Sequence, residues 1–238
     1  MHSHRKGFTL VEMLVVVGVI AVVAVLFVSV PVCSQRASNE RNATTSLKTL
    51  VYAEMDFRHN DRDWNGVNDY WTGDVRGLYT MTAAVVRGAE PNSTSDPSIK
   101  LIELSVACAD ADDTFVSAGG ENLPLSNFGT PSPKAGYWYA ALKSDRSTGV
   151  TYRQDTRGYP RMGLVHHETK FGFTAFPDST SAGKYVFMVN EAGTTIRTAL
   201  TASLRVGTES PPGLDTIPSV FLNWPDDASL KAKWAPLD

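Results

Sequence analysis

The sequence predicts an α+β fold in which one long N-terminal helix packs on an antiparallel sheet of about four strands. Three observations predict it. A short basic head is followed by an apolar run over residues 8–32, interrupted by a single charge. Residues 33–59 continue with apolar side chains at helical spacing. The second half of the chain instead carries aromatic residues that alternate with small ones, as in half-buried strands.

The apolar run is long enough to span a bilayer, which requires about 20 residues. Its N-terminal flank is short and contains Arg5 and Lys6. Basic residues on a short flank stay on the cytoplasmic side of the membrane. We therefore expect a single membrane pass with the rest of the chain outside the cytoplasm.

Glu12 does not fit an ordinary membrane anchor, because a carboxylate inside a membrane helix costs about 2.5–3.5 kcal/mol and usually has a partner. No basic residue lies one helical turn away within the apolar run. A cut between Gly7 and Phe8 would create an α-amino group on Phe8. That amine is poorly placed for the Glu12 of its own helix, but it can meet the Glu12 of a staggered neighbouring copy.

Residues 5–12 (RKGFTLVE) resemble the cleavage and methylation motif of type IV prepilins and type II secretion pseudopilins. In that family a membrane peptidase cuts after the glycine and methylates the new N-terminal phenylalanine, and the glutamate at the fifth mature position is needed for filament assembly. The resemblance implies cleavage after Gly7, methylation of Phe8 and an assembly role for Glu12. It divides the chain into a leader (1–7), a transmembrane and filament-core helix (8–32), an amphipathic continuation (33–59) and an exported pilin-like domain (60–238).

The resemblance implies a structural subunit, not an enzyme, that is assembled from the bacterial inner membrane into a type IV pilus-like filament. Its N-terminus would be cytoplasmic and its C-terminal domain periplasmic or extracellular. The implied partners are prepilin peptidase, other copies or related pilins, the inner-membrane assembly platform and, before assembly, membrane lipid.

Two alternative functions stay open. One is a pseudopilin of a type II secretion or DNA-uptake system, and the other is a monomeric membrane-anchored binding domain with a ligand site near Trp64 and Trp71. The position of Glu12 disfavours a plain signal-anchor. The length of the apolar run and the absence of a clear small-x-small site disfavour a cleaved secretory signal.

Pro31 lies just beyond the apolar core of the run, and a proline inside a helix removes a hydrogen bond and bends the axis. We nevertheless expect one helix from Phe8 to His59. Its second half carries Glu54 on a face that is otherwise an apolar stripe of Ala43, Leu47, Leu50, Val51 and Phe57. This stripe should pack on the sheet.

The loop after the helix carries alternating oxygen-bearing side chains. Four of them match positions 1, 3, 5 and 9 of an EF-hand calcium loop: Asp61, Asp63, Asn65 and Asp69. Gly66 fits position 6, but position 12 is Thr72 where the motif has a bidentate glutamate. Two alternatives remain, a structural calcium ion or an Asx-rich turn whose carboxylates accept backbone N–H groups.

In the middle of the chain, residues 98–109 are expected to form a helix. The acidic cluster that ends it, Asp110, Asp112 and Asp113, is interpreted as a solvated turn. Strands are expected at 136–143, 170–177, 184–190 and 194–198, the last two forming a hairpin with a short turn that contains glycine. The side chains expected to face the long helix are Phe171, Phe173, Val186 and Met188. The tail, residues 206–238, is expected to wrap the surface.

No recognisable catalytic set is present. The densest candidate is His166-His167-Glu168, but adjacent residues of a strand point to opposite faces, and we interpret these histidines as exposed. The net charge of −3 does not indicate a nucleic-acid partner. Cys33 and Cys108 lie far apart in the predicted fold, so no disulfide is expected.

Overall fold

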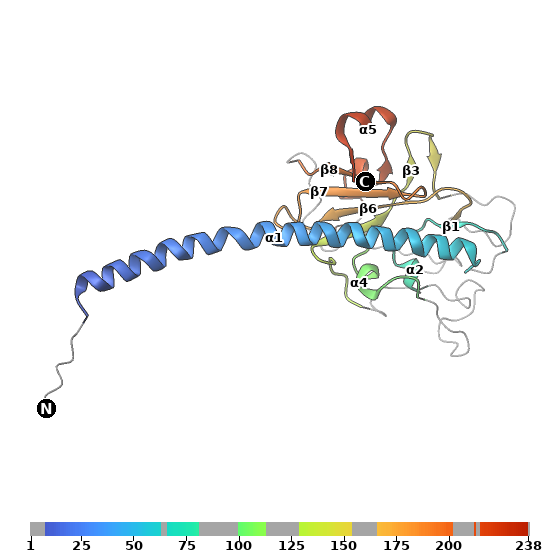
Figure 1. Ribbon diagram of the computed structural model, residues 1–238. Coiled ribbons are helices and arrows are strands. Elements are labelled where there is room, and N and C mark those ends of the chain that lie inside the picture. Colours follow the sequence, from blue (N-terminus) through green and yellow to red (C-terminus); the bar gives the residue numbers. More distant parts are fainter. Residues whose placement is uncertain are drawn as a thin grey trace, which may run out of the picture.

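The computed structural model describes residues 8–62, 66–80, 100–112, 129–153, 166–201, 212 and 215–237, with the side chains of residues 24–33 and 80 left outside the description. Helix α1 (Leu10–His59) runs unbroken for 50 residues, through Pro31, and confirms the single long helix. Its first half projects from a head domain and its second half lies along that domain (Figure 1). Among the described side chains, no helical stretch is long and apolar enough to cross a membrane.

A five-stranded antiparallel sheet forms the centre of the head. Its order is β10-β8-β7-β6-β2, made of β10 (Ala235–Pro236), β8 (Thr195–Ala199), β7 (Tyr185–Asn190), β6 (Gly172–Pro177) and β2 (Tyr137–Ala141). The predicted fold class is confirmed, and the four expected segments form strands. The fifth strand, β10, comes from the tail that was expected only to wrap the surface.

Smaller elements surround this sheet. Strand β1 (Tyr70–Trp71) pairs with β5 (His166–His167), and β3 (Ser144–Asp145) lies between β4 (Val150–Thr151) and β9 (Asn223–Trp224). The helices are α2 (Gly77–Thr80), α4 (Leu104–Ala107), the 3-10 helix η2 (Ser219–Phe221) and α5 (Asp227–Lys233).

Helix α4 is shorter than the helix expected over residues 98–109. Its chain leaves the helical path to pair with β2, because the N–H of Tyr139 donates to Ala109 O and the N–H of Ala111 donates to Tyr139 O, both at 2.8 Å. Backbone hydrogen bonds to a sheet edge therefore end the helix before the acidic residues do.

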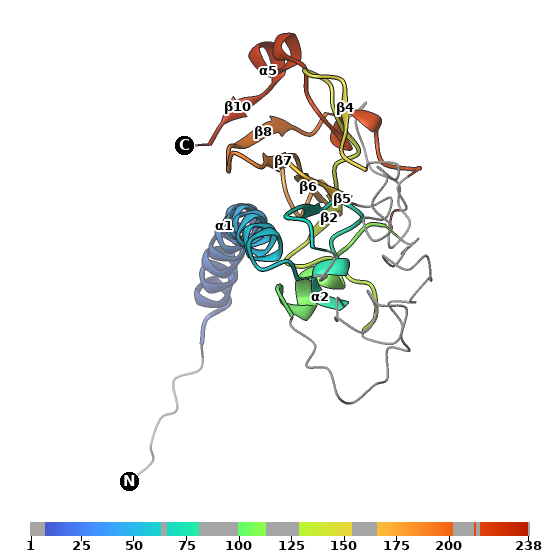
Figure 2. The ribbon, with the colours of Figure 1, turned by 90° about the vertical axis from the view of Figure 1, so that its right-hand side faces the viewer.

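Two apolar clusters lie on the two faces of the sheet. In Figure 2, which views α1 nearly end-on, α1 and α5 lie on different sides of the strands β6, β7 and β8. The predicted stripe of α1 fills the first, with Ala43, Leu47, Leu50 and Phe57 fully buried. The second cluster lies under β9, η2 and α5, and it buries Trp224 and Trp234 of the tail.

The predicted phase of β7 is wrong. Phe171 and Phe173 do lie in the cluster against α1, but Val186 and Met188 lie in the opposite one. Phe187 and Val189 face the helix instead. Both faces of this strand are buried, so its side chains are almost all apolar and their pattern cannot distinguish the two faces.

Three polar contacts hold α1 where it enters the head. Arg36 Nε donates to Ser181 O at 3.2 Å, Asn39 Nδ2 donates to Ala182 O at 2.9 Å, and Glu40 Oε1 accepts the N–H of Lys184 at 3.0 Å. All three partners lie in the turn between β6 and β7. This turn therefore holds the helix at the start of its packed half, and the three contacts together are here called the clasp.

Candidate functional site

The N-terminus of α1 is closed by a reciprocal pair of side chains. Thr9 Oγ1 accepts the N–H of Glu12 at 3.2 Å, while Glu12 Oε2 accepts both the N–H and the hydroxyl of Thr9 at 2.9 Å. This is a capping box, which satisfies backbone donors that the first helical turn leaves without partners. The uncut chain thus gives Glu12 a local role that its charge alone did not indicate.

The first half of α1 exposes its apolar side chains. Leu10 is 80% exposed, Val17 is 63% exposed and Val22 is 64% exposed. This part of the helix stands clear of the head (Figure 1). Monomeric soluble proteins rarely expose a continuous apolar surface of this kind, so it marks a surface that another molecule covers.

A family model for the prokaryotic N-terminal methylation motif matches residues 2–28. The chain carries the prepilin motif of the type IV pilin and type II pseudopilin family. The motif implies processing by prepilin peptidase and assembly with other pilins, and it indicates an inner-membrane precursor. Neither the curated proteins nor the solved structures contain a match to it.

Of the predicted processing residues, Phe8 is 78% exposed beside the capping box, and Gly7 lies outside the described residues. Their proposed roles in cleavage and methylation stay predictions.

The predicted calcium loop is described only in part, because Asp63 and Asn65 lie outside the described residues. Asp61 has a positive φ of 43° and its Oδ2 accepts the N–H of Gly66 at 3.0 Å, which is the local bonding of an Asx-type turn. Asp69 is fully buried, with Oδ1 3.4 Å from His166 Nδ1. Within the described part of the chain no group of three or more His, Cys, Asp or Glu side chains is arranged so that it could hold a metal ion. The calcium site stays a prediction.

A buried polar cluster joins the end of α1 to the β1–β5 pair. Glu54 is fully buried, and its Oε2 accepts the N–H of Trp71 at 3.0 Å. Its Oε1 has no hydrogen-bond partner within the described residues. Burial raises the pKa of Glu54 well above its usual range, since the charged form is poorly solvated there. The cluster therefore favours a neutral Glu54.

The histidines of the predicted catalytic candidate are buried, so their assignment to an exposed segment is wrong. The ring of His166 packs against two aromatic rings. Its centroid lies 6.0 Å from that of Phe57 and 5.3 Å from that of Trp71. His167 Nδ1 accepts the N–H groups of Thr169 and Lys170 at 3.0 Å. Their two-residue strand gives no alternation pattern, and the burial arises from pairing with β1 and from the covering α1.

The acidic cluster after α4 is also buried, and its interpretation as a solvated turn is wrong. Asp110 is fully buried, and its Oδ2 accepts the backbone N–H groups of Val75 and Arg76 at 2.8 and 2.9 Å. Asp112 is 3.3 Å from a guanidinium nitrogen of Arg153. Asp113 lies outside the described residues. These carboxylates serve as internal acceptors for segments that are distant in sequence.

Asp74 completes this cluster. One of its oxygens accepts Trp71 Nε1 at 3.1 Å and the N–H of Gly77 at 2.7 Å. Burial, with the nearby Asp110 carboxylate, raises the pKa of Asp74 to about 8. Three buried carboxylates therefore share one region with two arginines, Arg76 and Arg153, and Asp74 holds a proton at neutral pH.

This proton makes the stability of the head depend on pH. The folded state binds it more tightly than the unfolded state, where an aspartate has a pKa of about 3.9. The contribution to stability is thus complete at acidic pH and is lost as the pH rises from about 4 to about 8. Melting temperatures of the full-length chain between pH 5 and pH 9 should fall with pH. Asp74→Asn should flatten that fall, because the amide keeps the acceptor and cannot ionise; an equally steep fall in the variant would contradict the assignment.

Proposed function

We propose that the chain is a structural subunit that is cut after Gly7, methylated on Phe8 and built into a type IV pilus-like filament. The single observation that carries the proposal is the first half of α1, a capped helix with apolar side chains exposed on all sides. Before assembly these side chains would lie in the inner membrane. In the filament they would be covered by the same helices of neighbouring copies.

The pairing of charges would set the stagger between copies. In the uncut chain Glu12 accepts hydrogen bonds from Thr9 through one carboxylate oxygen, Oε2. Cleavage would place the α-amino group of Phe8 beside the apolar region. An unpaired charge in such surroundings is costly, so the stagger that brings the amine of one copy to the Glu12 of the next is selected.

The first half of α1 projects away from the head, so the proposal can assign the helix to the membrane and the head to the space outside it (Figure 1). The N-terminus would be cytoplasmic and the sheet-based head would lie on the periplasmic or extracellular side, anchored by the clasp at Arg36, Asn39 and Glu40. A type II pseudopilin would use the same processing and the same helix, since the motif is common to both kinds of subunit.

The intact mass of the chain tests the processing step. The full sequence is expressed in a host with prepilin peptidase and extracted from the inner membrane. The expected mass is that of residues 8–238 plus one methyl group, and a host without the peptidase should give the uncut chain. An uncut chain in both hosts would contradict the proposal and favour the monomeric membrane-anchored domain.

A further inference from the structure

Among the residues of α1 whose side chains are described, Glu54 is the one buried ionisable group. Leu50 and Phe57, about one turn before and after it, are apolar and fully buried, and Glu54 is fully buried with them. Replacing a buried ionisable group by an apolar residue of similar volume is often neutral or stabilising. The packing of α1 alone therefore does not account for a glutamate at this position.

Glu54 is bonded to the β1–β5 pair. Its Oε2 accepts the N–H of Trp71 at 3.0 Å, and Trp71 lies opposite His166 in the pairing of the two strands. Its Oε1 is buried and has no hydrogen-bond partner within the described residues. The carboxyl group thus joins the inner side of the last turns of α1 to the two strands, although one of its oxygens gains no bond there.

The basic side chains near Glu54 are bonded to other groups. In the segment before β1, Asp69 is fully buried, and its Oδ1 lies 3.4 Å from Nδ1 of His166 on β5. One turn further along α1, Arg58 donates from Nε to Asn68 O at 3.1 Å. Within the described residues, therefore, Glu54 has no ion pair with either of these basic groups.

Three more titratable side chains lie on the segments packed against Glu54, and each bonds elsewhere: Tyr70 with Arg58, Asp74 with the indole of Trp71, and His167 with the N–H groups of Thr169 and Lys170. An ionised Glu54 would therefore add a second negative charge to a region that already holds Asp69, without gaining a positive partner. Burial, together with the charge of Asp69, raises the pKa of Glu54 well above its usual range.

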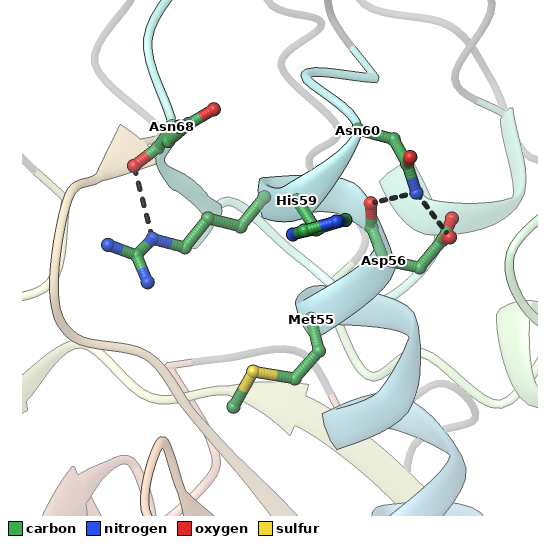
Figure 3. A pocket seen from close by; sticks show the side chains of 6 residues that line it. Met55, Asp56, His59, Asn60 and Asn68 are labelled. Carbon is green, nitrogen blue, oxygen red and sulfur yellow. Dashed lines mark hydrogen bonds between the residues drawn. The ribbon is translucent and has the colours of Figure 1, made fainter.

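The outer flank of the same turns borders two cavities. One has a volume of about 500 Å³ and is lined by Met55, His59 and Asn68 among others (Figure 3). The other, of about 360 Å³, lies between α1 and the β7–β8 turn and is lined by Tyr52 and Met55 among others. The last turns of α1 are therefore held through their inner side, where Glu54 lies, and are not packed on this flank.

We propose that Glu54 is a proton-dependent latch that holds the last turns of α1 on the β1–β5 pair. Protonated Glu54 keeps the helix docked through the N–H of Trp71. Loss of the proton places an unpaired charge among apolar side chains, and releasing residues 54–59 hydrates that charge without unfolding the rest of the head. The inference concerns the head alone and does not depend on the proposed filament.

The direction of the pH effect follows from linkage. The folded head binds the proton of Glu54 more tightly than the unfolded chain does, because the pKa of this group is raised in the folded state. The latch is therefore closed at acidic pH, and it opens as the pH rises through that raised pKa.

Hydrogen exchange of the full-length chain in detergent, measured by mass spectrometry between pH 5 and pH 9, tests the latch. After correction for the intrinsic effect of pH on amide exchange, the protection of residues 54–60 and of Trp71 should fall about tenfold or more as the pH rises, which corresponds to one unit of pKa shift or more. The protection of β6 and β7 should stay constant, because the opening is local.

Glu54→Gln is the matched variant. Its amide oxygen can still accept the N–H of Trp71 but the side chain cannot ionise, so the protection of residues 54–60 should not depend on pH. Both chains are also compared in an Asp74→Asn background, which removes the titration of the other carboxyl group that bonds Trp71. The difference between the two chains should persist there.

Three results would overturn the latch. Constant protection of residues 54–60 in the wild-type chain across this pH range would do so, whether or not the variants fold. An equal loss of protection in Glu54→Gln would assign the opening to another group. An equal loss over β6 and β7 would mean that the head unfolds as a whole and that no local latch exists.

Discussion

Replacing Glu12 by alanine is expected to leave the chain in the membrane and to abolish filament assembly. The apolar helix that inserts is unchanged, but the carboxylate that would neutralise the Phe8 amine of a neighbouring copy is gone. The unpaired amine then has to be buried among apolar helices, which is costly. The measurement is the ratio of sheared filament to membrane-bound subunit, compared with the wild type at equal expression.

The capping box provides a control that separates two roles of Glu12. Glutamine at this position can still accept from the Thr9 backbone, because capping boxes use either Glu or Gln. Glu12→Gln should therefore keep the helix cap and still fail to assemble, whereas Thr9→Ala should weaken the cap and still assemble. Assembly by the glutamine variant at the wild-type yield would show that the cap, and not the charge, is what matters.

Truncation of Phe57 to alanine is expected to be the most damaging single change to the head. Phe57 is fully buried on the stripe of α1 and its ring contacts His166 of β5. Removing a buried phenylalanine ring costs about 3–5 kcal/mol of unfolding free energy, because apolar contacts are lost and a cavity remains. Thermal and urea unfolding of the full-length chain in detergent, followed by circular dichroism, measure this loss.

A graded set of variants makes this second prediction specific. Phe57→Leu retains much of the apolar volume and should lose less stability than Phe57→Ala. Thr45→Ala changes an exposed residue of the same helix and should stay within about 0.5 kcal/mol of the wild type. A Phe57→Ala variant as stable as Thr45→Ala would mean that the helix does not pack on β5 as described.

Periodicity predicted the parts of the fold in which one face is buried and the other is solvated. The apolar residues of α1 recur at helical spacing, and the opposite face of the helix is exposed to solvent. Their spacing therefore identified the buried residues. The β7–β8 hairpin was equally readable, because its strands are joined by a short turn in which Gly193 has a φ of 72°.

The sequence did not predict those features of the fold that depend on tertiary contacts. A run such as Asp110 to Asp112 has the composition of a solvated turn, yet two backbone N–H groups from Val75 and Arg76 make its burial stable. Strand β10 has only two residues and contains Pro236, so its pairing with β8 depends on neighbouring segments. Partners this distant in sequence leave no local pattern.

In the candidate site too, the sequence predicted the local features and not those that depend on contacts between separate segments. The cleavage and methylation motif is a local sequence feature and could be recognised directly. The capping box was also visible as Thr9 and Glu12 three residues apart, but the charge of Glu12 drew the interpretation toward pairing between copies. The hydrogen bond between Glu54 and Trp71 could not be foreseen, since it forms only when the segment that follows α1 folds back onto the end of the helix.

The clasp between α1 and the β6–β7 turn has a mechanical consequence. A subunit in a fibre under tension would be pulled along its helix axis, and the load would enter the head at Arg36, Asn39 and Glu40. The antiparallel strands beside α1 are joined to one another by the hydrogen bonds of the sheet, and the helix packs on these strands through its buried stripe. The pull is then shared as shear over a long contact, not concentrated at one point where the helix could peel away.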